Sequence, residues 1–238
     1  MRPSTLFGTL AALLLLPAVS FAQGSPAGVC ASGSCHAGVS SAALVHQPLR
    51  EGKCTACHLP APGFTAADHS ASSFRADHTP SASCLACHPD TTQRLSLAFT
   101  HVPAAEEGCA ACHAPHGSDS PFLLVAPYPR ETLMVYKAGK YGLCWDCHEE
   151  MLASEKFTSS ATSFRMGERN FHYSHLHKRR GGMSCRACHD PHGTPQERLV
   201  RREGPSGDAA WKSRMTFLRD AAGGRCVGGC HKDIRYRR

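Results

Sequence analysis

The fourteen cysteines of this 238-residue chain form seven pairs, and a histidine directly follows the second cysteine of every pair. Five pairs read Cys-x-x-Cys-His, and the first and last pairs are longer, with four and three residues between the cysteines. This order is the attachment signature of c-type haem, in which two thiols bond to the porphyrin and the adjacent imidazole binds the iron. The sequence therefore predicts about seven covalent haem c groups. The predicted attachment residues are Cys30, Cys35, Cys54, Cys57, Cys84, Cys87, Cys109, Cys112, Cys144, Cys147, Cys185, Cys188, Cys226 and Cys230. The predicted proximal iron ligands are His36, His58, His88, His113, His148, His189 and His231.

Zinc sites and disulfides are the alternative uses of so many cysteines. Zinc motifs do not require a histidine directly after every second cysteine, so the repeated order disfavours zinc. Disulfides within the pairs would leave the seven adjacent histidines without a role. For the Cys30–Cys35 pair, whose spacing is the longest, a local disulfide stays open as an alternative to haem attachment.

The nine remaining histidines are candidates for the second axial position of each iron. Three of them, His46, His101 and His177, precede a Cys-x-x-Cys-His motif by the same eight residues, which favours them as distal ligands. Iron with two imidazole ligands has no open site for a substrate. The histidine count therefore favours electron transfer over catalysis.

These offsets divide the chain into three two-haem modules, at 44–100, 101–171 and 172–238. A segment with one motif, 23–43, precedes them. Repeated units of this kind bury the cofactor of a neighbouring unit and do not share one hydrophobic centre. We expect a mostly irregular fold with short α-helices and little or no β-sheet, organised around the covalently bound haems.

Four segments carry local structural signals. Helices are predicted at 132–143 and at 209–222, where the second has apolar residues near one face and two glycines as a stop signal. Residues 60–83 are rich in Pro, Ala and Ser and predict an irregular connector. Residues 149–170 predict a polar insertion that begins with a short helix.

The second and third modules share a specific turn, Cys112-His-Ala-Pro-His116-Gly and Cys188-His-Asp-Pro-His192-Gly. With these motifs the chain resembles the doubled Cys-x-x-Cys-His family of multihaem c-type cytochromes, which includes proteins similar to cytochrome c3. The resemblance covers roughly residues 44–232. It implies that His116 and His192 each serve as an axial ligand to another haem.

The first module departs from this pattern, because Ala61 stands where the family places the ligand histidine. His69 or His78 must then substitute, and likewise His172 and His175 are alternatives in the third module. The distal ligands predicted in this way are His46, His78, His101, His116, His172, His177 and His192.

Residues 1–22 predict a cleaved secretory signal. Arg2 precedes an uncharged, largely apolar run from Leu6 to Leu16, and small residues flank a cleavage site that leaves Gln23 as the first residue. No later stretch approaches the ~18 apolar residues that cross a bilayer. We expect a periplasmic or secreted protein with no membrane span in its mature form.

The formal net charge of +7 at pH 7 does not indicate nucleic-acid binding once the haems are counted. The predicted signal removes one positive charge, and each ferric haem with ionised propionates adds about −1, so the mature holoprotein has a net charge of about −1. The expected partners are redox proteins: a quinol-linked donor and a terminal reductase or outer-membrane cytochrome.

We expect an electron-transfer protein of anaerobic or extracellular respiration and not an enzyme. One alternative is a multihaem oxidoreductase that reduces nitrogen or sulfur oxyanions. No motif replaces the proximal histidine by lysine, as pentahaem nitrite reductases do. A second alternative is a homo-oligomer or cytochrome filament in which a spare histidine binds iron in the next subunit.

Overall fold

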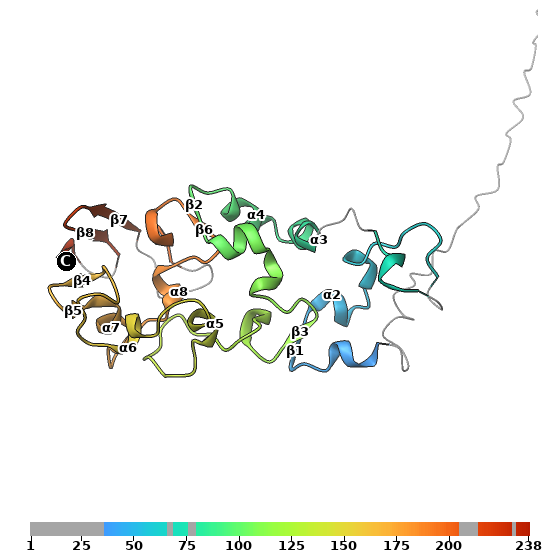
Figure 1. Cartoon of the computed structure of the whole chain (residues 1–238), viewed down its shortest axis with the longest axis horizontal. Helices are drawn as coiled ribbons and strands as arrows, with labels where there is room; N and C mark the ends of the chain where they lie inside the picture. The colour runs from blue at the N-terminus through green and yellow to red at the C-terminus, as the bar shows by residue number, and fades with distance from the viewer. Residues whose placement is uncertain (1–35, 66–68, 76–79, 205–213, 230–231) are drawn as a thin grey trace, which may run out of the picture.

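The computed structural model describes residues 36–65, 69–75, 80–204, 214–229 and 232–238. Short elements follow one another along an elongated molecule, with residues of the first module at one end and the C-terminus at the other (Figure 1). The α-helices are α2 (Gln47–Arg50), α3 (Pro80–Cys87), α4 (Pro89–Leu95), α5 (Gly142–Trp145), α6 (Met151–Ser154), α7 (Phe171–Leu176) and α8 (Cys185–Cys188). Tighter or wider single turns are η1 (Ala37–Ser40), η2 (Cys54–Ala56), η3 (Ala71–Ser73), η4 (Pro103–Glu107), η5 (Cys109–Ala111), η6 (Pro121–Leu123) and η7 (Glu197–Leu199). The strands are β1 (Leu44–Val45), β2 (Phe99–Thr100), β3 (Gly117–Ser118), β4 (Arg165–Met166), β5 (Arg169–Asn170), β6 (Gly193–Thr194), β7 (Met215–Asp220), β8 (Gly223–Gly228) and β9 (Ile234–Arg237).

Two small antiparallel sheets link successive modules in the same way. Strand β1, just before His46, pairs with β3, just after His116. Strand β2, just before His101, pairs with β6, just after His192. Each sheet thus brings a histidine of one module beside a histidine of the next. The expectation of short helices is confirmed, and the sheet content is low but not absent.

The C-terminal helix predicted at 209–222 is wrong where the structure describes it. Residues Met215–Asp220 form strand β7 of a three-stranded antiparallel sheet, in the order β7-β8-β9. The two glycines read as a helix stop instead begin β8, after a turn in which the Asp220 carboxylate accepts bonds from the backbone N–H of Ala222 and Gly223. A Cβ on Gly223 would collide with the backbone of β9, so close strand packing explains this glycine.

The helix predicted at 132–143 is also wrong, except for its last two residues, which enter α5. The segment is irregular because its backbone bonds with a distant part of the chain. The N–H of Tyr136 donates to the carbonyl of Leu176, and the N–H of Ser184 donates to that of Thr132. These tertiary bonds replace the local ladder that a helix would have formed.

The other two local predictions hold in large part. Helix α6 lies near the start of the polar segment 149–170, as predicted. The connector 60–83 is irregular where it is described, apart from one turn, η3, until α3 begins at Pro80.

The apolar core of the described residues is small and divided along the chain. Its main cluster contains Leu124, Tyr128 and the fully buried Tyr141. Cys144 and Cys185 pack against this cluster from two different motifs. Tertiary order therefore centres on the cysteine motifs.

In the part of the chain that is described, no helix is long and apolar enough to span a bilayer.

Candidate haem-binding sites

The five Cys-x-x-Cys-His motifs each form one helical turn, in η2, α3, η5, α5 and α8. In every one, the backbone N–H of the histidine donates to the carbonyl of the first cysteine, at 2.9–3.1 Å. Such a turn places residues three and four positions apart on one side of the helix. Both thiols and the imidazole are thereby gathered on one side, as attachment to one porphyrin requires. The described cysteines from Cys54 to Cys226 form no disulfide with one another.

Six of the predicted proximal histidines each face a second histidine with nearly parallel rings. The angles between ring planes run from 10° to 30°. The ring-centroid distances are 5.8 Å for His36–His69, 6.3 Å for His88–His46, 5.8 Å for His58–His116, 6.1 Å for His148–His101, 6.1 Å for His113–His192 and 6.3 Å for His189–His172.

These distances are those expected of two axial ligands on opposite sides of one metal ion. A metal–imidazole bond is about 2 Å long, so two imidazoles on one ion have centroids about 6 Å apart. In the described residues no group of three or more acidic, Cys or His side chains gathers around a common point. The residues present therefore fit haem iron with two axial imidazoles.

The pairs connect neighbouring modules. His116 of the second module faces His58 of the first, and His192 of the third module faces His113 of the second. Both donors lie in the Pro-His-Gly turns that the sequence singled out. His46 and His101 instead face a histidine of the second motif in their own module. A histidine of each later module therefore faces a proximal histidine of the module before it.

Two of the proximal histidines are oriented by the same strained turn. Phe122–Leu123 and Arg198–Leu199 each adopt left-handed backbone angles, with φ between 55° and 60°. The carbonyl of the first residue of each turn accepts a bond from Nδ1–H of the proximal histidine, at 3.0 Å for His113 and 2.8 Å for His189. Left-handed angles in such residues cost about 1–3 kcal/mol each. In return the bond fixes the tautomer that leaves Nε2 for a metal.

Burial holds several of the paired imidazoles in their neutral form, which is the form that binds a metal. Burial, together with the nearby His189 and His175, lowers the pKa of His172 to about 3. Burial likewise lowers the pKa of His189 and His113, although a backbone hydrogen bond opposes it in each. The Nδ1 atom of His172 lies 3.1 Å from the Thr162 hydroxyl, which orients its ring.

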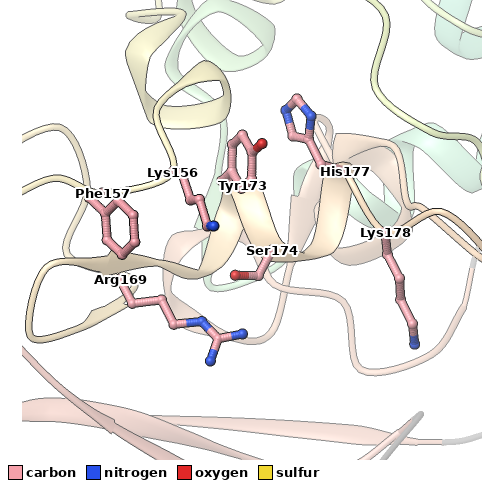
Figure 2. A pocket seen from close by; sticks show the side chains of 7 residues that line it. All are labelled: Lys156, Phe157, Arg169, Tyr173, Ser174, His177 and Lys178. Carbon is pink, nitrogen blue, oxygen red and sulfur yellow. The ribbon is translucent and has the colours of Figure 1, made fainter.

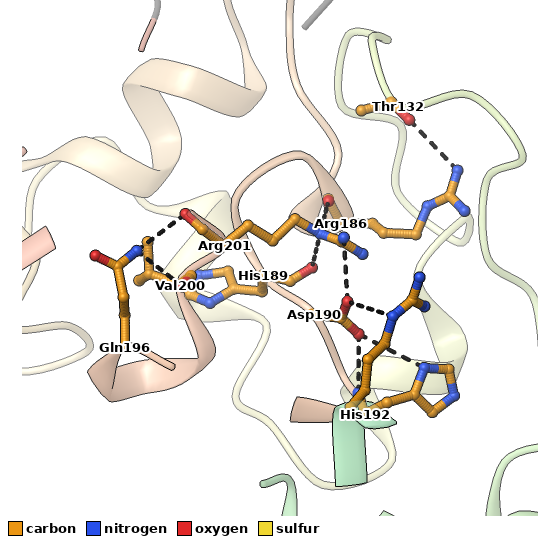
Figure 3. A network of polar contacts seen from close by, with 9 residues as sticks. Thr132, Arg186, His189, Asp190, His192, Gln196, Val200 and Arg201 are labelled. Carbon is orange, nitrogen blue, oxygen red and sulfur yellow. Dashed lines mark hydrogen bonds and ion pairs between the residues drawn. The ribbon is translucent and has the colours of Figure 1, made fainter. Parts of the chain in front are cut away.

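A buried carboxylate, Asp190, supports the turn that carries His192 (Figure 3). It accepts the backbone N–H of His192 at 3.1 Å and lies 3.5 Å from its Nδ1. Its other oxygen pairs with Arg201 at 3.1 Å and with Arg94 at 3.7 Å. Burial alone would raise the pKa of Asp190, but the bonds from His192 and the charge of Arg201 hold it below the usual value. The sequence pattern gave no sign of this role, because the second module has Ala114 at the matching position.

First cysteines of successive motifs also meet in pairs. The thiols of Cys84 and Cys109 are hydrogen-bonded, and burial followed by the proximity of Cys109 raises the pKa of Cys84 to about 11. The thiols of Cys144 and Cys185 are hydrogen-bonded as well, and this bond with burial raises the pKa of Cys144. Attachment positions of the third and fourth motifs, and of the fifth and sixth, are therefore in contact.

His177, which was predicted as a distal ligand, stacks on tyrosines and faces no proximal histidine among the described residues. The His177 ring lies on Tyr173, with centroids 3.9 Å apart, and its Nε2 bonds to the Ala153 carbonyl at 3.0 Å. His175 bonds through Nδ1 to the Phe171 carbonyl at 2.6 Å. His69, the alternative to His78, is the histidine that faces His36. The predicted residues Cys30, Cys35, His78, Cys230 and His231, and the signal at 1–22, lie outside the described residues.

The family description "doubled CXXCH motif" matches residues 46–93, 101–153 and 177–207, which together make up more than half of the chain. The chain belongs to the doubled CXXCH family. It is a multihaem c-type cytochrome, consistent with the type similar to cytochrome c3, and this confirms the resemblance seen in the sequence. As a member of the doubled CXXCH family it binds haem covalently and serves in electron transfer. No curated protein matches the chain.

Proposed function

We propose that this doubled CXXCH protein carries seven haems, each with two axial histidines, and relays electrons without catalysing a reaction of its own. The observation that supports this most is the set of six facing histidine pairs, each with one proximal histidine and one from elsewhere in the chain. When bound, haem supplies a reversible one-electron iron couple. The chain's own facing imidazoles would hold the iron from both sides and would so exclude small ligands.

For the seventh haem, attached at Cys226 and Cys230 with His231 as proximal ligand, the distal ligand in this proposal is His175. Its Nδ1 lies 2.6 Å from the Phe171 carbonyl, and this bond orients the ring. Its ring stacks on Phe164 at 5.7 Å, and Phe164 contacts Tyr236 of β9 at 5.1 Å. Strand β9 pairs with β8, which contains Cys226. His177, in contrast, has its Nε2 engaged by a carbonyl.

The proposed setting is the periplasm or the cell exterior. The predicted signal at 1–22 supports export, and covalent haem attachment is typical of proteins outside the cytoplasm. The proposed donor is linked to quinol oxidation, and the proposed acceptor is a terminal reductase or an outer-membrane cytochrome, in anaerobic or extracellular respiration.

Ligand binding to the ferric holoprotein tests this proposal. Optical and electron paramagnetic resonance spectra are recorded with and without cyanide, and again with nitrite. We expect seven low-spin haems and no spectral change, because no axial position is open. One high-spin haem per chain that binds nitrite would instead support the oxidoreductase alternative. High-spin iron that becomes low-spin as the protein concentration rises would support a filament or oligomer with shared histidines.

A further inference from the structure

A pocket lies beside helix α7, and Tyr173, Ser174 and His177 are among the residues that line it (Figure 2). Its volume is about 490 Å³, within the range of small-molecule sites. Three cationic side chains project around it: Lys156, Arg169 and Lys178. No carboxylate is among the residues that line it. The pocket is therefore concave and strongly positive.

The three cations are not neutralised by the protein. Among the described residues, neither an ion pair nor a side-chain hydrogen bond engages Lys156, Arg169 or Lys178. Several other Lys and Arg side chains of the molecule do pair with a nearby carboxylate. Two more exposed cations, Arg179 and Arg180, directly follow Lys178. Unpaired cations around a hollow attract anions, and a divalent anion more strongly than a monovalent one.

The pocket also has aromatic walls. Phe157 is 60% exposed, and the Lys156 ammonium group lies 5.3 Å from the centre of its ring. Across the pocket, Tyr173 and His177 form a parallel stack with centroids 3.9 Å apart and planes inclined by 14°. Phe157 thus offers an exposed ring and Tyr173 with His177 a half-buried one, and flat rings bind planar aromatic molecules by stacking.

We propose that this pocket binds a planar aromatic molecule that carries two or more negative charges. The cations recognise its anionic groups, and Phe157 with the Tyr173–His177 stack holds its ring. A concave site of this volume suits a small molecule better than the flat face of a protein partner. The proposal does not depend on the electron-transfer role, since binding to the ferric protein requires no turnover.

The aromatic wall continues into the protein. His177 contacts Tyr136 at 4.8 Å, and Tyr136 stacks on Tyr141 at 5.3 Å. Tyr141 belongs to the buried cluster against which Cys144 and Cys185 pack. An aromatic ligand in the pocket would therefore lie at the outer end of a continuous row of packed rings that leads to two attachment positions.

Isothermal titration of the ferric holoprotein at low ionic strength tests the proposal. The probes are naphthalene disulfonate, naphthalene monosulfonate and inorganic sulfate, all of which are redox-inert. We expect the disulfonate to bind about fivefold more tightly than the monosulfonate, because one exposed charge pair contributes up to about 1 kcal/mol. Sulfate, which cannot stack, is expected to bind at least about threefold more weakly than the disulfonate.

Variants locate the site. Lys156→Gln and Arg169→Gln are each expected to weaken disulfonate binding about two- to fivefold, and the double variant about tenfold. Phe157→Leu is expected to weaken the disulfonate about threefold and to leave sulfate unchanged, because it removes a stacking surface and no charge. The matched control is Arg50→Gln, since Arg50 is an exposed cation of α2 in the first module, far from α7 in Figure 1.

Three results would overturn the proposal. The disulfonate does not bind the wild type, or sulfate binds as tightly as the disulfonate, or Arg50→Gln weakens binding as much as Lys156→Gln. The comparison of probes uses only the wild-type protein, so it remains decisive even if the double variant does not fold. Loss of probe binding with normal low-spin spectra would refute the pocket alone and leave the electron-transfer proposal intact.

Discussion

Replacing His192 by alanine should convert one haem, and only one, from low spin to high spin. In the structure, His192 faces His113 with ring centroids 6.1 Å apart, and His113 belongs to the Cys109–Cys112 motif. His113 keeps its own anchor, the bond from Nδ1–H to the Phe122 carbonyl at 3.0 Å. The variant therefore loses one axial ligand while the proximal ligand stays oriented.

The magnitude follows from the proposed count of haems. With seven haems and one vacated axial position, the high-spin ferric signal should integrate to about one-seventh of the total iron. Cyanide should bind to that fraction and to no more. The assay is quantitative electron paramagnetic resonance of the ferric holoprotein, with the haem content measured on the same sample.

His177→Ala is the matched control. His177 shares the eight-residue offset that favoured it as a ligand, yet its ring packs on Tyr173 and its Nε2 bonds to the Ala153 carbonyl. We expect this variant to lose packing but to keep every haem low-spin. A fully low-spin His192→Ala protein, or one high-spin haem in His177→Ala, would refute the assignment of ligands from facing rings.

Three further predictions concern the support of the sites. Gly193→Ala should lower the free energy of unfolding by about 1–3 kcal/mol in thermal melts, because its Cβ would collide with the Arg94 backbone. The control Gly38→Ala, with open space around the new Cβ, should be neutral. Equal melting temperatures of the two variants would contradict this. Asp190→Asn should cost about 2 kcal/mol in denaturant unfolding, because it leaves the half-buried Arg201 and Arg94 without their charged partner. An unchanged midpoint would count against the ion network. In acid titration of the ferric protein, the stability contributed by the His172–His189 pair should be complete above the unfolded pKa of about 6.5 and persist below it, because burial lowers the folded pKa of His172. Release of the pair already near pH 6.5, seen by comparison with His172→Ala, would contradict this.

Covalent haem attachment and most of the candidate site could be predicted from the sequence because the signals are local. A cysteine pair followed by histidine is complete within five or six residues, and the Pro-His-Gly turn sits next to it. Which histidine faces which motif is not local, since it depends on contacts such as the pairing of β1 with β3. That His116 and His192 each face a motif of the preceding module could therefore be predicted only from the family resemblance.

The eight-residue offset was a weaker guide for the same reason. His46 and His101 stand before a turn and beside a strand that joins two modules. His177 has the same offset but ends helix α7, where it turns toward Tyr173 and Tyr136. The histidines that point from α7 toward Phe164 and His189 are His175 and His172. Equal spacing in sequence thus produced different positions in space.

The errors in secondary structure had a common cause. Residues 132–143 bond to a segment of the third module, and residues 215–220 pair with the strand that follows them in a hairpin, so partners outside each segment satisfy the backbone groups. In a chain with so small an apolar core, backbone pairing with another segment decides local structure more than side-chain propensity does. Such pairing has no signature within a single segment.

The intact mass of the exported protein, produced together with cytochrome c assembly machinery, counts the covalently attached haems. We predict the mass of the chain from Gln23 onward plus seven haems. A mass with six haems would assign Cys30 and Cys35 to a disulfide and correct the count. A folded exported protein whose mass includes no haem would contradict the account.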